Sequence, residues 1–156
     1  MKLTTLCYLL KDDEMLMLHR VKKKEDVNKG KWIGVGGKFE SDESPDECAR
    51  REIFEETGLT VHECTPRGIV TFCYNNDEPE YMHLFTSECF SGELVKECDE
   101  GNLKWIKCSE VEQLNLWAGD RIFLKLLKEK EPFFLLKLVY HNDELMKAYL
   151  NGKRIQ

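Results

Sequence analysis

The sequence lacks the features that mark membrane, secreted and zinc-stabilised proteins. No stretch approaches the roughly 20 apolar residues of a membrane-spanning helix, and the segment MKLTTLCYLLKDDEML lacks the apolar run and cleavage site of a signal peptide. The seven cysteines include no Cys-x-x-Cys pair, and their number is odd, so neither a disulfide framework nor a zinc site is expected. We therefore expect a cytoplasmic protein with reduced thiols and no membrane partner.

An excess of basic residues is also missing. The chain has 23 Lys and Arg against 29 Asp and Glu, a formal net charge of -6. Broad capture of nucleic acid needs a basic surface that displaces counterions from phosphates, so no stable nucleic-acid partner is expected. The net negative charge favours solubility. A local acidic cluster can also bind a divalent cation, which can in turn bind phosphate. A small anionic substrate is therefore compatible with this charge.

Internal repeats, low-complexity segments and linkers are absent as well. The 156 residues are 42% hydrophobic, which supplies apolar material for one core. A domain of this size buries roughly 70% of the surface that its unfolded chain exposes. We expect residues 1–156 to form a single domain.

Short apolar runs predict a sheet. Residues 3–10 and 14–20 predict a hairpin around a Lys-Asp-Asp-Glu turn. In the tail, residues 132–150 fit two strands around His-Asn-Asp-Glu, although the second half fits a helix equally well. Other strands are predicted from β-branched and aromatic content at residues 59–64, 68–74, 81–90 and 103–108.

The clearest helix spans Pro45 to Thr57. Ser44 and Glu47 form an S-x-x-E capping box, Pro45 takes the first helical position, and Gly58 supplies the stop. These signals fix both ends of the helix.

Two further helices are predicted in the C-terminal half. A short one covers residues 109–113. A longer one, residues 120–131, has apolar residues at helical spacing, with Asp120 as its N-cap and Pro132 as its end.

Three glutamates of the first helix lie over one sector, because Glu55 and Glu56 follow Glu52 by three and four positions. Any one alone would be an ordinary solvated residue. Together they repel by roughly 0.2 to 0.5 kcal/mol per pair, which asks for a compensating positive charge. A divalent metal such as Mg²⁺, which prefers oxygen ligands, supplies it. Arg51 is spaced to hold one of these carboxylates in place.

This segment resembles the Nudix box, which reads Gly, five residues, Glu, seven residues, Arg-Glu, aliphatic, any residue, Glu-Glu, any residue, Gly, aliphatic. No fixed position departs from the pattern. The matching residues are Gly37, Glu43, Arg51, Glu52, Ile53, Glu55, Glu56, Gly58 and Leu59.

The resemblance implies an α/β fold, an α/β/α sandwich with a central mixed sheet, in which the box forms a loop, a helix and a loop. It also implies a Mg²⁺ site, with Mn²⁺ as a possible substitute. The implied metal ligands are Glu52, Glu55, Glu56 and the backbone carbonyl of Gly36.

Other residues receive supporting roles from the same resemblance. Glu43 and Arg51 brace the loop and orient carboxylates, and Gly37 and Gly58 are structural positions of the box. Glu100 lies outside the box and is the best positional candidate for a further metal ligand or general base, or it is a plain loop carboxylate. The implied reaction is hydrolysis of a diphosphate linkage, in which metal ions activate a water that a glutamate orients or deprotonates.

Most of the chain resembles the MutT-like sanitising hydrolases, especially bacterial 8-oxo-dGTP diphosphatases. Lys38, after the paired glycines, is placed to meet a phosphate. Trp117 could stack on a purine, or be a core tryptophan, and Asp120 could bond the purine edge. The mammalian oxidised-purine hydrolases have Asn where this chain has Ile33, and an acidic pair where it has Gly119 and Asp120. Their selectivity therefore does not carry over directly.

Three functions follow as alternatives. The first is a nucleoside triphosphate pyrophosphohydrolase that acts on oxidised purines and releases monophosphate and pyrophosphate. The second is a Nudix hydrolase for another nucleoside diphosphate derivative, a nucleotide sugar or a dinucleoside polyphosphate. The third is a non-catalytic nucleotide-binding module, against which the complete box argues.

Overall fold

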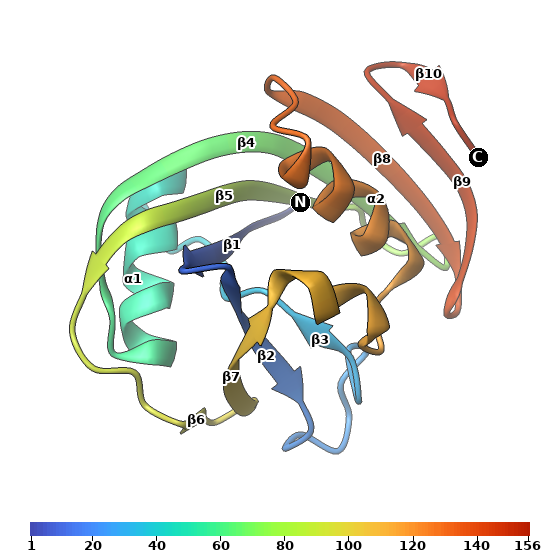
Figure 1. Ribbon diagram of the computed structural model, residues 1–156. Helices are drawn as coiled ribbons and strands as arrows, with labels where there is room; N and C mark the ends of the chain where they lie inside the picture. Colours follow the sequence, from blue (N-terminus) through green and yellow to red (C-terminus); the bar gives the residue numbers. More distant parts are fainter.

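A computed structural model describes residues 1–156 of the protein. The chain forms ten strands, two α-helices and one 3₁₀ helix (Figure 1). In chain order the elements are β1 (Lys2–Lys11), β2 (Glu14–Arg20), β3 (Trp32–Ile33), α1 (Pro45–Thr57), β4 (Thr60–Tyr74), β5 (Glu80–Ser91), β6 (Glu97–Cys98), β7 (Gly101–Lys107), the 3₁₀ helix η1 (Cys108–Gln113), α2 (Ala118–Lys128), β8 (Phe134–His141), β9 (Glu144–Leu150) and β10 (Lys153–Arg154).

The strands form one sheet with parallel and antiparallel pairs. Nine of them follow the order β10-β9-β8-β4-β5-β1-β2-β7-β6, and β3 pairs with β2. β1 runs parallel to β5, and β4 runs parallel to β8. Neighbours along the chain, such as β4 and β5 or β8 and β9, are antiparallel. The predicted mixed sheet is thus confirmed.

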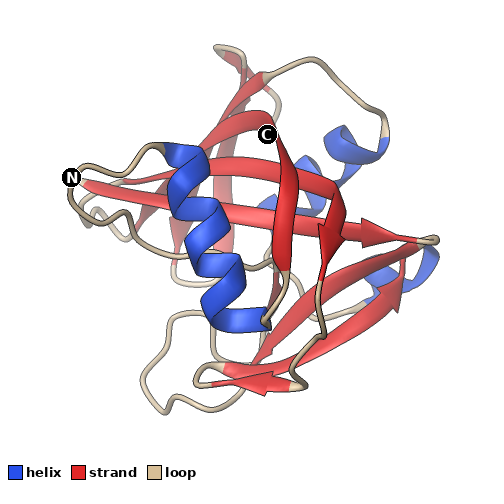
Figure 2. Ribbon diagram, turned by 90° about the vertical axis from the view of Figure 1, so that its left-hand side faces the viewer, coloured by secondary structure: helices blue, strands red, loops and turns tan.

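The two α-helices cover opposite faces of the sheet (Figures 1 and 2). Ala49 and Ile53 of α1 are fully buried in one apolar cluster with residues of β1, β2 and β4. Phe123 and Leu127 of α2 belong to a second cluster, which includes Tyr8. Each helix therefore buries its apolar side against the sheet, as expected for a helix with one apolar face, and the α/β/α sandwich is confirmed.

Helix α1 has the predicted ends. The Ser44 side chain accepts a hydrogen bond from the Glu47 backbone N–H, and the Glu47 side chain accepts one from the Ser44 N–H. Gly58 ends the helix in the left-handed conformation, at φ 79°, and its N–H donates to the carbonyl of Phe54. These signals act within one stretch of chain, and a side-chain cap typically contributes about 1 kcal/mol.

Strand β4 corrects the prediction of separate strands at residues 59–64 and 68–74. It is one strand that pairs with β5 along most of its length, with register shifts between Val61 and Glu63 and again around Pro66. Proline lacks a backbone N–H for the ladder, so it is found within sheets at edges or bulges. The bulges let the strand continue past a residue that, in sequence, indicates a break.

The prediction that Asp120 caps the second long helix is wrong. Trp117 is the N-cap residue, and Asp120 lies in the first turn with its side chain buried. The helix also ends at Lys128, before Pro132. Asp120 does not cap the helix because the helix begins two residues before it, at Ala118.

The tail forms strands β8 and β9, so the helical alternative for its second half is wrong. Along β8 buried residues alternate with more exposed ones, which is the period of a strand packed on one face. The two-residue strands β6 and β10 were not predicted. No helix of the structure has the length and apolar character needed to span a membrane.

Candidate active site

The glycine-rich loop after β3 lies against β1. The N–H of Thr5 donates to the carbonyl of Gly37 at 2.9 Å, and the N–H of Cys7 donates to that of Val35 at 2.7 Å. A Cβ atom on Gly36 would lie 1.9 Å from the Thr5 carbonyl oxygen, so only glycine permits this approach. The carbonyl of Gly36 itself accepts no hydrogen bond from the protein and is available to a ligand.

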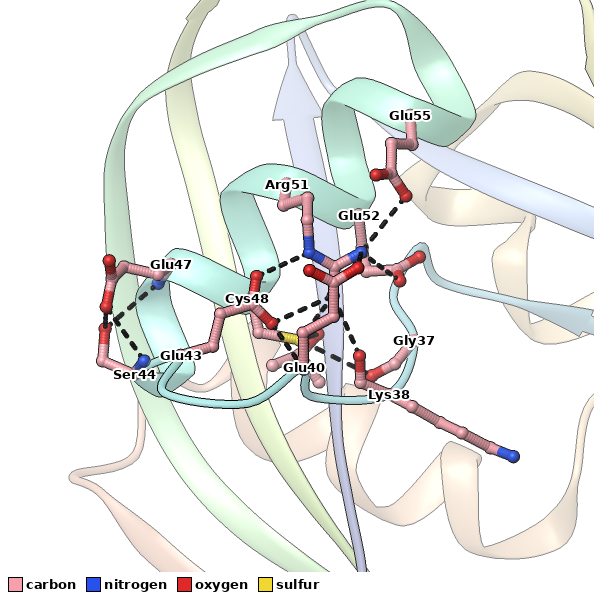
Figure 3. A network of polar contacts seen from close by, with 11 residues as sticks. Gly37, Lys38, Glu40, Glu43, Ser44, Glu47, Cys48, Arg51, Glu52 and Glu55 are labelled. Atoms are coloured by element: carbon pink, nitrogen blue, oxygen red, sulfur yellow. Dashed lines mark hydrogen bonds and ion pairs between the residues drawn. The ribbon is translucent and has the colours of Figure 1, made fainter.

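Arg51 joins this loop to the carboxylates of α1 (Figure 3). Its guanidinium bonds Glu43 at 2.5 Å, Glu52 at 2.8 Å and Glu55 at 3.2 Å, and the backbone carbonyl of Lys38 at 2.9 Å. The hydrogen bonds from Arg51 lower the pKa of Glu43 to about 2. This geometry suits the bracing role that the resemblance to the Nudix box implies for Glu43 and Arg51, because a planar guanidinium can donate to several oxygens at once.

Glu56 is the most buried glutamate of the helix, with 8% of its surface exposed. Its Oε2 atom is buried without any hydrogen-bond partner. Burial, followed by the negative charges of Glu100 and Glu52, raises the pKa of Glu56 to about 9. A buried carboxyl oxygen without a partner is costly, and a cation at this position would remove the cost.

The structure brings Glu52, Glu56 and Glu100 together but turns Glu55 outward. The Glu55 side chain is 55% exposed and contacts Arg51. Glu100 forms ion pairs with Arg20 at 3.3 Å and with Lys23 at 3.7 Å.

A divalent metal fits these residues in chemistry. No three acidic, histidine or cysteine side chains converge tightly enough to form a ready-made coordination cage. Mg²⁺ does not require one, because it usually keeps several waters and takes one or two carboxylates with substrate phosphates. The unpartnered oxygen of Glu56 and the free carbonyl of Gly36 are hard oxygen donors of the preferred kind.

A cleft of about 530 Å³ extends from these carboxylates to α2. Glu52, Glu100 and Gly36 line its acidic end. Lys38 also lines it, and its side chain extends away from the Arg51 network (Figure 3). Because Lys38 takes part in no ion pair within the protein, its ammonium group is free to meet an anion.

Trp117 is at once a core residue and a cleft residue. It is 3% exposed and packs edge-to-face with Phe72 and Tyr140, yet it lines the cleft. Its Nε1 atom donates to Oδ1 of Asn28 at 2.8 Å, which fixes the ring plane. The two alternatives for this tryptophan are thus compatible.

Asp120 lines the same cleft and makes no hydrogen bond through its side chain within the protein. Burial raises its pKa to about 8, against a smaller opposing effect of Lys31. At neutral pH the carboxyl is therefore mainly protonated and can both donate and accept a hydrogen bond. Ile33 also lines the cleft, where its side chain supplies only apolar contact.

Several cleft residues were missed by the sequence reasoning. The β2–β3 loop forms one wall, and within it Asp26 accepts a hydrogen bond from Arg20 at 2.9 Å. A polar loop beside the glycines was a usable signal for this wall. Phe72 and Met82 come from central strands, where apolar residues that line a cleft look the same in sequence as those that fill a core.

Gly37→Ala is expected to lower kcat at least about tenfold, because the new methyl would lie 2.4 Å from the Glu52 carboxyl carbon and displace it. The melting temperature should change little, since the Glu52 side chain can move. Ser41→Ala, an exposed change in the same loop, is the matched control. Kinetics and thermal unfolding of both variants check this, and an unchanged kcat for Gly37→Ala would show that the position of Glu52 is immaterial.

The fold and the loop–helix–loop of carboxylates define a hydrolase of phosphoric anhydrides, and comparison with known proteins agrees. Residues 2–127 match the NUDIX domain. The chain therefore belongs to the Nudix hydrolase family.

Individual relatives cover most of the chain. It is 33% identical to the oxidized purine nucleoside triphosphate hydrolase of Danio rerio, over 85% of this chain and 83% of that protein. It is 31% identical to an uncharacterized Nudix hydrolase of Bacillus subtilis, over 97% and 96%. Among solved structures, the MutT protein of Bacillus halodurans superposes with a TM-score of 0.88 at 28% identity, over 98% of this chain and 99% of that one.

Proposed function

We propose that this Nudix hydrolase is a Mg²⁺-dependent nucleoside triphosphate pyrophosphohydrolase that acts on oxidised purine nucleotides such as 8-oxo-dGTP. It releases the nucleoside monophosphate and pyrophosphate. The observation that carries the proposal is one continuous cleft, whose lining includes Glu52 and Glu100 at an acidic end and Trp117 and Asp120 beside α2. The Danio rerio relative is an oxidized purine nucleoside triphosphate hydrolase, which supports the same substrate class.

The base end suits an oxidised purine. The edge of ordinary guanine presents O6 and N7, both acceptors. In 8-oxoguanine N7 carries a proton, so the same edge presents one acceptor and one donor. The protonated carboxyl of Asp120 also offers one donor and one acceptor, and is complementary to that pair. An unpaired buried group would penalise the ordinary base by about 1 to 3 kcal/mol.

At the acidic end, bound Mg²⁺ would neutralise phosphate charge and make water a better nucleophile. The residues that would hold it are Glu52, Glu56 and the Gly36 carbonyl, with Glu55 and Glu100 as further carboxylates of the set. Arg51 keeps the Glu52 carboxylate and the glycine loop in place. In this proposal Glu100, which Arg20 holds, would accept a proton from the attacking water or serve as a further ligand; its contact with Arg20 and its closeness to Glu56 support this role.

Lys38 and the cleft walls bind the rest of the substrate. The free ammonium group of Lys38 pairs with a phosphate. Trp117 offers its ring to a purine, in an orientation that the Asn28 hydrogen bond fixes.

A turnover panel tests the proposal directly. It contains 8-oxo-dGTP, dGTP, ATP, a nucleotide sugar and a dinucleoside polyphosphate at fixed Mg²⁺, with products identified. The expected result is the highest kcat/KM for 8-oxo-dGTP, with monophosphate and pyrophosphate as products. A higher kcat/KM for the sugar or the dinucleoside compound would replace the proposed substrate, and binding without any turnover would indicate a non-catalytic module.

Asp120→Ala is expected to reduce the preference for 8-oxo-dGTP over dGTP by about 5- to 150-fold in the ratio of kcat/KM values, since it removes a buried hydrogen-bonding group. Trp117→Ala is a poorer test, because loss of a buried ring costs about 3 to 5 kcal/mol of stability. Both nucleotides are measured with each variant at fixed Mg²⁺. An unchanged ratio would remove Asp120 from base recognition.

Recognition of the oxidised base should also depend on pH. The pKa of Asp120 is raised from its ordinary value of 3.8 to about 8, so the protonated form persists up to that pH and is lost above it. The carboxylate that then forms still accepts from the N7 proton of 8-oxoguanine but no longer donates to O6. The kcat/KM of the wild type for 8-oxo-dGTP, divided by that of Asp120→Asn, should therefore be steady below about pH 7 and fall as the pH rises past 8, because asparagine does not titrate and keeps both a donor and an acceptor.

A further inference from the structure

Strand β8 carries Tyr140, whose hydroxyl contacts the first turn of α2 behind the residues that line the cleft. Tyr140 is 3% exposed, and its hydroxyl accepts a hydrogen bond from the backbone N–H of Gly119 at 2.6 Å. Gly119 lies in the first turn of α2, whose N-cap residue Trp117 makes no side-chain capping bond. The first N–H groups of a helix have no partner within it, so the Tyr140 hydroxyl takes the place of the missing cap.

The residue types at positions 119 and 140 match sterically. A Cβ atom at Gly119 would lie 2.6 Å from the Tyr140 hydroxyl oxygen and 2.4 Å from Cδ1 of Leu138. The hydroxyl thus occupies space that a side chain at position 119 would need. This wall of the cleft therefore presents only the carboxyl of Asp120, where an acidic pair at positions 119 and 120 would present two.

Tyr140 also supports the aromatic part of the wall. Its ring centroid lies 5.0 Å from that of Trp117, at an interplanar angle of 75°, and 5.2 Å from that of Phe72. Trp117, Phe72 and Asp120 line the cleft, whereas Tyr140 stands behind them. Burial raises the pKa of Tyr140, so its hydroxyl stays protonated at physiological pH.

From these contacts we infer that the Tyr140 hydroxyl is a positioning group for base recognition. By holding the Gly119 amide it fixes the first turn of α2, and with it the Asp120 carboxyl and the Trp117 ring at the base end of the cleft. The C-terminal hairpin β8–β9 then contributes to selection of the purine base as well as to the sheet. This inference rests on the proposed function of the cleft.

Tyr140→Phe tests the inference, because it keeps the ring and removes only the hydroxyl. The preference for 8-oxo-dGTP over dGTP is expected to fall about 3- to 10-fold, the usual effect of one hydrogen bond. The change should appear in KM more than in kcat, with unaltered activation by Mg²⁺. Tyr149→Phe, on the neighbouring strand β9, is the matched control, because the Tyr149 hydroxyl makes no hydrogen bond within the protein.

A second measurement does not depend on turnover. Amide hydrogen exchange in the nucleotide-free protein should show faster exchange at Gly119 in Tyr140→Phe, and no change in Tyr149→Phe. In an Asp120→Ala background, Tyr140→Phe should alter the preference little, because residues that act through one another are not additive.

The outcomes separate this inference from the proposed function. If the wild-type protein hydrolyses 8-oxo-dGTP preferentially and Tyr140→Phe keeps the same ratio, the positioning role is overturned. If instead another nucleotide of the panel is preferred, the proposed substrate fails. The role of Tyr140 is then tested with the preferred nucleotide, by comparing its KM and the Gly119 exchange rate between Tyr140→Phe and the wild type. If neither quantity changes, the positioning role of Tyr140 is overturned.

Discussion

Glu56→Gln is expected to lower kcat at least about 100-fold, on the scale of other charged groups that act at a reacting centre. Glutamine preserves the shape of the side chain but cannot supply the negative charge that the buried Glu56 carboxyl, whose Oε2 atom has no other partner, would carry with a metal bound. Steady-state kinetics over a range of Mg²⁺ concentrations measures the effect. Near-normal turnover at saturating Mg²⁺ would refute the assigned role of Glu56.

Although Glu56→Gln lowers kcat, it should not lower the stability of the metal-free protein. Burial raises the pKa of Glu56 from 4.5 to about 9, so the folded protein holds a proton that the unfolded chain has lost. This linkage lowers wild-type stability progressively between about pH 4.5 and pH 9. Without metal, Glu56→Gln should therefore melt no lower than wild type at pH 8. Glu88→Gln, an exposed change on β5, is the control for both activity and melting temperature.

Removal of divalent metal with EDTA is expected to abolish turnover, and added Mg²⁺ to restore it, with Mn²⁺ as a possible substitute. The reason is electrostatic: Glu52, Glu56 and Glu100 lie close enough for their charges to raise the pKa of Glu56, so phosphate cannot approach them without a cation. Turnover that persists in EDTA would contradict a metal-dependent reaction.

Binding can be measured apart from activity. A ligand that binds only the folded state at 100 times its Kd stabilises it by about 2.7 kcal/mol, so Mg²⁺ should raise the melting temperature of the wild-type protein. The rise should be much smaller in Glu56→Gln and unchanged in Glu88→Gln. An equal rise in all three proteins would place the cation elsewhere.

Local signals determined the part of the protein that carries the family identity. The ends of α1 depend on Ser44, Glu47, Pro45 and Gly58, which act on neighbouring backbone groups and need no distant contact. The box spacing and the carboxylates of α1 likewise lie within one segment of chain. The mixed sheet and the sandwich were expected only from the resemblance of this segment to the Nudix box, because strand pairing is long-range and no local signal reports it.

Only the tertiary structure decided the character of the base end. In sequence Asp120 indicates a helix cap, whereas in the fold it is a buried carboxyl with a pKa near 8, because burial depends on strands from distant parts of the chain. The Tyr140 hydroxyl reaches Gly119 through the tertiary fold, in which β8 pairs with β4. Local propensity cannot report such contacts, since they are set by the long-range packing that places α2 against β8.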